Sequence, residues 1–189
     1  MGQTIGAGMR VYLPATLPML RETVSSGTFC PVHGFGFAVT ADLQAEYVSA
    51  DSEDLEYVAM HDAALASLRL IATDAADPVR VVLAIDAVVG PAAEGAAAED
   101  AAQLVVVERG DLDRAVVSIT GPVAWDAIAA VHLDGGDVAT IIRAAADAVA
   151  AADLGDMDAA LIVGDAEDID LGWYAPSEIG YLVTELSSP

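Results

Sequence analysis

The sequence predicts a single α/β or α+β domain, a sandwich in which helices flank a mixed sheet of about six strands. Three observations support this class. Short runs rich in β-branched residues recur along the chain, segments with apolar residues at helical spacing lie between them, and no long linker or clear repeat divides the 189 residues. Strict alternation of strand and helix fails in 104–133, where we expect adjacent, antiparallel strands.

The predicted strands are short apolar segments bounded by turn-forming residues. The near-continuous apolar character of 79–85 and 104–107 indicates strands that are buried on both faces. The predicted set comprises 10–13, 35–39, 79–85, 104–108, 115–120 and 128–133, joined by 159–163 and 171–175.

Helices are predicted between the strands, each preceded by a residue that can cap its first turn. They are 17–26 after Thr16, 41–49 after Thr40, 53–73 opened by Ser52, 138–152 after Asp137, and a last helix from 178 after Ser177. The turns that lead from strand to helix, at 13–18, 39–42 and 174–178, are expected on the surface.

The domain is expected to occupy 9–189. Residues 1–8 are glycine-rich and precede a second methionine, Met9, so they are interpreted as a flexible leader or an early start codon. Residues 90–103 contain Ala, Gly and Glu with hardly any large apolar residue, which predicts a mobile acidic loop.

Charge limits the possible partners. The chain has 30 acidic residues against 7 basic ones, all of them arginine, and a formal net charge of −23. Direct nucleic-acid binding needs a basic surface and is not expected, and anionic membranes are disfavoured for the same reason. The acidic surface is interpreted as a solvated face, a face that meets a basic partner, or a nucleic-acid mimic.

The residue inventory also bears on location and chemistry. A lone cysteine cannot form an internal disulfide, no uncharged apolar run approaches the length of a membrane span, and the N-terminus lacks the features of a signal peptide. A cytoplasmic protein is expected. The absence of lysine excludes Schiff-base chemistry and the lysine of a phosphate-binding loop.

Several segments carry a resemblance. They are "MRVYLPATLPMLRE", "FAVT", "HDAALASLRLIA", "SITGPVAWDAIAAVHLD" and "LGWYAPSEIGYLV". Together they resemble a family of small uncharacterised proteins of GC-rich actinobacteria, over residues 9 to about 186. The resemblance implies a bacterial cytoplasmic protein and supplies no activity, cofactor or catalytic residue.

Cys30 and His33 form the first candidate site, in the stretch "GTFCPVHGFG". A thiolate beside an imidazole base is the arrangement of a cysteine nucleophile. The same pair supplies two zinc ligands, which His61 or His132 and an acidic group would have to complete. No arginine or lysine lies between Arg21 and Arg69 to stabilise a thiolate, and the flanking glycines favour a loop, which is the interpretation we prefer.

The acidic segment 153–173 is the second candidate. Asp156 with Asp158, or Asp168 with Asp170, could hold magnesium with help from elsewhere. The spacing does not match the calcium-binding loop, and a solvated acidic surface is the favoured interpretation.

His61 is the third candidate, because Glu53, Tyr57 and His61 share a helix face at a spacing of four. A Glu–His pair can act in acid–base catalysis, although an exposed helix residue is the favoured interpretation. Trp173 is left open between a binding rim and the core, whereas Tyr174 is expected in the core.

No serine nucleophile elbow, phosphate loop or paired-cysteine zinc motif is present in the sequence. We therefore expect a non-enzymatic acidic protein that binds another protein, with a basic partner and no cofactor. The alternative is a small hydrolase or transferase that uses Asp and Glu residues with a divalent metal.

Overall fold

A computed structural model describes residues 8–88, 105–108 and 114–185. Its centre is a seven-stranded sheet, and a small second sheet pairs β2 (Thr28–Phe29) with β7 (Val123–Ala124). In spatial order the large sheet contains β5 (Val105–Glu108), β6 (Val116–Thr120), β3 (Phe35–Ala38), β1 (Gly8–Thr16), β4 (Arg80–Val88), β8 (Ile128–Leu133) and β9 (Gly172–Tyr174). The predicted class is confirmed, a single domain in which helices flank a sheet.

The sheet is antiparallel in every pairing between its described strands, which corrects the expectation of a mixed sheet. Residues 81–85 of β4 are apolar because helices cover both faces of the strand, so burial on both faces did not require a parallel neighbour. β5 and β6 are adjacent, as expected for 104–133. β8 instead pairs with β4 and β9 on the other side of the sheet.

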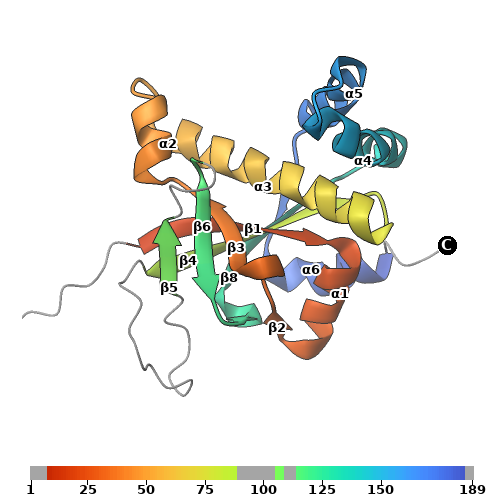
Figure 1. The fold of residues 1–189 in the computed structure, drawn as a ribbon. Helices are drawn as coiled ribbons and strands as arrows, with labels where there is room; N and C mark the ends of the chain where they lie inside the picture. Colours follow the sequence, from red (N-terminus) through yellow and green to blue (C-terminus); the bar gives the residue numbers. More distant parts are fainter. Residues whose placement is uncertain (1–7, 89–104, 109–113, 186–189) are drawn as a thin grey trace, which may run out of the picture.

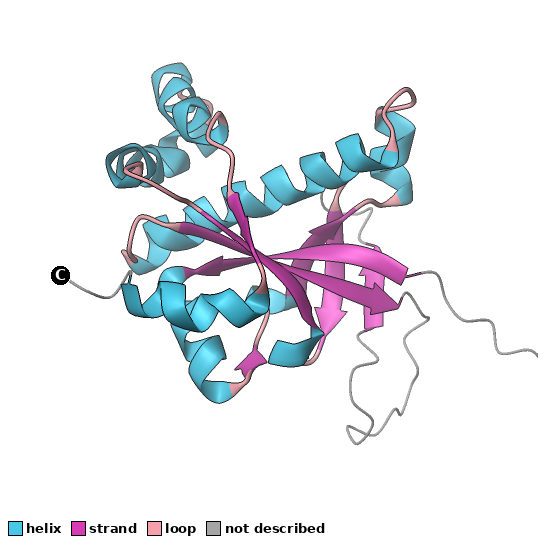
Figure 2. Cartoon of the chain, turned by 180° about the vertical axis from the view of Figure 1, so that it is seen from behind, coloured by secondary structure: helices cyan, strands magenta, loops and turns pink. Residues whose placement is uncertain are grey.

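The helices divide between the two faces of the sheet (Figures 1 and 2). They are α1 (Leu17–Ser26), α2 (Ala41–Glu46), α3 (Ser52–Asp74), α4 (Ala139–Asp153), α5 (Met157–Glu167) and α6 (Pro176–Glu185), with short 3-10 turns at Val32–Gly34 and Trp125–Ala127. α3 crosses one face of the sheet, and α1, α6 and the β2–β7 pair cover the other. α4 and α5 form a hairpin that projects on the α3 side.

α3 begins at Ser52 because Asp51 caps it. The Asp51 carboxylate accepts hydrogen bonds from the Glu53 and Asp54 amides, and the Asp54 carboxylate accepts one from the Asp51 amide. This reciprocal pair is a capping box. The buried side of α3 is rich in small side chains, which lets the helix lie close against Tyr12, Val82, Ala84 and Ala130 of the sheet.

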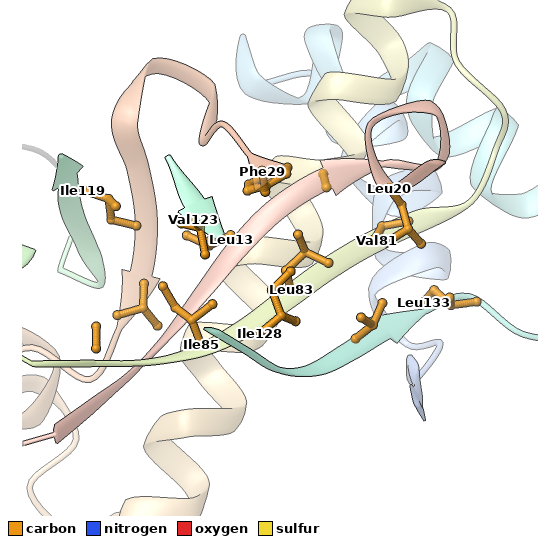
Figure 3. Packing of buried hydrophobic residues seen from close by; sticks show 14 of the residues in the cluster. Leu13, Leu20, Phe29, Val81, Leu83, Ile85, Ile119, Val123, Ile128 and Leu133 are labelled. Carbon is orange, nitrogen blue, oxygen red and sulfur yellow. The ribbon is translucent and has the colours of Figure 1, made fainter. Parts of the chain in front are cut away.

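The main core lies on the other face (Figure 3). Because side chains alternate along a strand, Leu13, Leu83 and Val131 point to this side while their chain neighbours face α3. Leu20 of α1, Phe29 of β2, Val123 of β7 and Ile179 of α6 close the layer.

The turn between β1 and α1 is buried, which corrects the expectation that 13–18 lies on the surface. Thr16 is 2% exposed, and Leu13, Ala15 and Leu17 are likewise buried. β1 is a central strand, so its end runs beneath α3. There the Ser67 hydroxyl donates to the Ala15 carbonyl oxygen (2.6 Å) and accepts from the Val81 amide (3.0 Å).

Residues 159–163, predicted as a strand, lie within α5. The Asp156 carboxylate caps the helix by accepting from the Ala159 amide. Ala159, Val163 and Ala166 are buried and recur at helical spacing, and Val163 and Ala166 pack with α4 and with Leu68 and Ile71 of α3. A five-residue apolar run does not distinguish a strand from a buried helix segment, and here packing against α4 and α3 selects the helix.

The predicted leader and acidic loop fall almost entirely outside the described residues. Residues 1–7 and 90–103 lie outside the described residues, and Gly8 is the first residue of β1. No helix among those described is long and apolar enough to cross a membrane.

Candidate interaction surface

Cys30 and His33 lie on an exposed loop between β2 and β3. Phe29, which is buried, anchors the start of this loop, and His33 adopts a left-handed backbone conformation (φ 53°) within the 3-10 turn. No hydrogen bond joins the thiol to the imidazole. The structure places both residues in a loop, whereas a role for the pair in catalysis or in zinc binding stays a hypothesis.

His61 is linked to the acidic segment through Tyr57. The two rings lie one turn apart on α3, with centroids 4.5 Å apart and planes tilted by 44°. The Tyr57 hydroxyl donates to Asp170 Oδ1 (2.9 Å), and this hydrogen bond raises the pKa of the phenol. The chain of contacts holds the connection between α5 and β9 against α3.

The four candidate aspartates do not form one group. Asp156 caps the start of α5 and Asp158 lies in its first turn, whereas Asp168 ends the helix and Asp170 follows it. A helix of 11 residues separates the two pairs by about 16 Å. Among the described residues, no three His, Cys, Asp or Glu side chains are placed to hold a metal ion.

Trp173 is 62% exposed and lies opposite His132 in the β8–β9 pairing, so both side chains project on the α3 face. Tyr174 points the other way and packs against the main core, as expected. Trp173 thus belongs to the surface rather than to the core.

A buried ion pair between Arg80 and Asp134 was not predicted. Arg80 Nη2 lies 2.7 Å from Asp134 Oδ1, and the Arg80 amide donates to Asp134 Oδ2 (2.7 Å). The guanidinium also donates to the Ile169 carbonyl oxygen (2.9 Å). The two residues are 54 positions apart in the chain, and only an arginine at the start of an apolar strand hinted at the pair.

A second unpredicted contact joins Tyr12 to α3. The Tyr12 hydroxyl donates to Glu56 Oε2 (3.3 Å), and burial together with the Glu56 charge raises the pKa of the phenol to about 12. The His132 ring packs edge-on against Tyr12 at 6.3 Å, and burial lowers the pKa of its imidazole. The alternation of side chains along a strand could have placed Tyr12 on the face that α3 covers. No local feature of the sequence indicated that Glu56 of α3 would be its partner.

Two hollows in the surface lie beside the connection between α3 and β4. A hollow of about 220 Å³ is lined mostly by apolar residues, among them Pro78, Leu133 and Tyr174. An open depression of about 400 Å³ lies between the start of α1 and the segment that follows α3. The first is small for a ligand pocket, and neither is lined by Cys30, His33 or His61.

The described arginines are already engaged within the protein. Five of the six form ion pairs: Arg10 with Asp86, Arg21 with Asp77, Arg69 with Asp153, Arg80 with Asp134 and Arg114 with Glu46. The sixth, Arg143, donates to the Ala76 carbonyl oxygen (2.7 Å). Asp158 and Asp165 of α5 have no such partner in the part of the chain that is described. The negative surface is thus uncompensated on α5.

The same helix exposes large apolar side chains. Met157 and Leu161 are 77% and 72% exposed, and Leu154, in the turn before α5, is 90% exposed. Most large apolar residues of the described chain are buried in its three clusters. An exposed apolar group beside uncompensated carboxylates is a feature of interaction surfaces.

A family model described as a family of unknown function (DUF6912) matches residues 9–183. The chain belongs to this family. The DUF6912 match runs from β1 into α6 and contains α5 with its exposed face. The resemblance to an uncharacterised family is confirmed, and the actinobacterial origin stays a prediction. No curated protein and no solved structure matches the chain.

Proposed function

We propose that this DUF6912 protein is a non-enzymatic cytoplasmic protein that binds a basic protein partner through its acidic surface. One observation carries the proposal. The net charge is −23, and the described arginines are engaged internally, so the counter-charge for the remaining carboxylates must come from solvent ions or from a partner. A basic partner that displaces those ions gains electrostatic complementarity and a faster encounter.

The separation of the candidate catalytic groups supports a binding role over the metal-dependent hydrolase or transferase. Asp156 and Asp158 lie at one end of α5 and Asp168 and Asp170 at the other. Asp170 accepts the Tyr57 hydroxyl, and Asp156 caps its helix. Metal-assisted hydrolysis requires ligands that converge on one ion, and these carboxylates do not converge.

The experiment is a capture of partners on the immobilised full chain, from a bacterial lysate, at low and at high ionic strength. We expect a basic protein that is retained at low salt and released at high salt, because charge attraction between surfaces is screened. The purified partner should then bind in a calorimetric titration with a defined stoichiometry.

The competing outcome is stabilisation by a metal. A ligand that binds only the folded state must raise its melting temperature. Reproducible stabilisation by magnesium, manganese or zinc that is lost in Asp168→Asn or Cys30→Ser, with no stoichiometric basic partner, would contradict the proposal and favour the metal-dependent enzyme.

A further inference from the structure

The outward face of α5 has the pattern of a helix-docking surface. Met157, Ala160, Leu161 and Gly164 follow the spacing i, i+3, i+4 and i+7, which places them on one side of the helix. The opposite side, with Ala159, Val163 and Ala166, is buried, and Val163 and Ala166 pack against α4 and α3. Because the α4–α5 hairpin projects from the domain, nothing in the described chain covers the outward face (Figures 1 and 2).

Gly164 is a second indication that the outward face of α5 is a contact surface. Its backbone is not in the left-handed region, and a Cβ built on it would meet no atom within 4 Å. Glycine within a helix costs about 0.5–1 kcal/mol relative to alanine. No packing within the described chain requires it. A close approach by another backbone would use the space that glycine leaves open.

Charge decides which partner fits. Asp158 and Asp165 lie along one edge of the apolar stripe, at helical positions about 80–100° from Met157. Neither pairs with any of the six arginines that the structure describes. A second copy of the chain would bring two net charges of −23 together, and like charges across an interface cost several kcal/mol. A basic helix with an apolar stripe meets both the carboxylates and the exposed side chains.

We propose that the outward face of α5, formed by Met157, Ala160, Leu161 and Gly164, docks a basic amphipathic helix of the partner protein. This inference rests on the proposed function, and it names the surface and the chemistry of the partner. Apolar anchors of the partner helix cover Met157 and Leu161, and its Arg or Lys side chains reach Asp158 and Asp165. Two helices that pack through apolar stripes meet at positions spaced i, i+3, i+4 and i+7.

The test uses the full chain and a fluorescent synthetic peptide of about 18 residues, long enough for about 27 Å of helix. The peptide carries leucines at helical spacing and arginines on its other positions. A shuffled peptide of the same composition, which cannot form an apolar stripe, is the control. Fluorescence anisotropy reports the binding of each peptide.

We expect the amphipathic peptide to bind at least about tenfold more tightly than the shuffled one, which corresponds to about 1.4 kcal/mol. Leu161→Asp and Met157→Asp should each abolish this preference. Val48→Asp is the matched control, since Val48 is also a highly exposed apolar residue but lies between α2 and α3. Gly164→Leu should weaken binding without unfolding the protein, because its side chain would point into open space.

The peptide-binding results distinguish a docking face on α5 from an acidic surface that binds any basic partner. Equal, salt-sensitive binding of both peptides, unaffected by Leu161→Asp, would overturn the docking face while leaving an acidic binding surface. Failure of both peptides to bind at low salt would contradict both proposals. A dimer detected by analytical ultracentrifugation and abolished by Leu161→Asp would overturn the inference, because a second copy would then occupy the face.

Discussion

Arg80 and Asp134 carry opposite charges inside the protein, at 2% and 5% exposure. The pair joins the first residue of β4 to the residue after β8, and its third partner, the Ile169 carbonyl, belongs to the connection that leads from α5 to β9. The Nε and Nη2 groups of the guanidinium thus donate to Asp134, and Nη2 also donates to the Ile169 carbonyl. Removing one member leaves an uncompensated buried charge.

We predict that Asp134→Ala lowers the free energy of unfolding by about 3–5 kcal/mol. The matched control is Asp153→Ala, which removes the exposed partner of Arg69 and should cost at most about 1 kcal/mol. Urea unfolding followed by circular dichroism measures both. Equal losses in the two variants would show that the buried pair has no special role.

The raised pKa of Tyr12 predicts that the folded protein loses stability at alkaline pH. Its phenol has a pKa of about 12 in the folded state, against 10.0 ordinarily. Below pH 10 both states keep the proton, so stability is unaffected there. As the pH rises from 10 through 12, the unfolded state releases the proton first and is favoured by up to about 2–3 kcal/mol.

The variant Tyr12→Phe tests this limit. It should lose about 1 kcal/mol at neutral pH, because the hydrogen bond to Glu56 is absent, and it should lose less stability than the wild type between pH 10 and 12. Unfolding in urea at a series of pH values measures the difference. An identical alkaline decline in both proteins would contradict a buried, neutral phenol at this position.

At the level of single strands, β3 depends on a glycine. A Cβ added to Gly36 would lie 2.8 Å from Ile119 Cδ1 and 2.9 Å from side-chain carbons of Leu13 and Val11. Real Cβ atoms do not approach so closely, and these three side chains are buried in the main core. A methyl group at this position would therefore force the buried side chains of β1 and β6 to shift.

We predict that Gly36→Ala destabilises the protein by about 1–3 kcal/mol through overpacking. Gly164→Ala is the control, because its Cβ meets open space and helix propensity should make the variant about 0.5–1 kcal/mol more stable. Adding Ile119→Val to Gly36→Ala should recover part of the loss, since it removes the methyl group that is closest. Additive losses in that double variant would argue against the steric explanation.

Across the entire chain, repulsion between negative charges opposes the stabilisation that the ion pairs provide. The exposed ion pairs contribute at most about 1 kcal/mol each and weaken in salt. A net charge of −23 instead destabilises the compact state at low ionic strength, and screening relieves that repulsion. The repulsion is larger than the contribution of the ion pairs, because the chain has 30 acidic residues and only 7 basic ones.

We therefore predict that the melting temperature rises when sodium chloride shortens the Debye length from about 30 Å to about 8 Å. The double variant Asp158→Asn/Asp165→Asn should melt higher than the wild type at low salt and gain less from added salt. Differential scanning calorimetry measures both. A melting temperature that falls on adding salt would mean that the ion pairs outweigh the repulsion.

Local patterns in the sequence predicted most of the elements. The β-branched runs in 10–13, 79–85 and 128–133 are strands. Thr16 and Thr40 stand at helix starts, and the Thr40 side chain accepts a capping hydrogen bond. These features depend on backbone geometry and on neighbours a few residues away, so a sequence displays them directly. The uncompensated charge also follows from composition alone.

Contacts between distant segments required the three-dimensional arrangement. The pairing of β1 with β4 rather than with a parallel neighbour, the approach of Tyr57 to Asp170, and the enclosure of Arg80 with Asp134 each join residues with no local signal of one another. The assignment of 159–163 to a helix belongs with them, because the same five apolar residues fit either structure until α4 offers a surface to cover. Packing, which is set by all elements together, selects among the arrangements that local preferences allow.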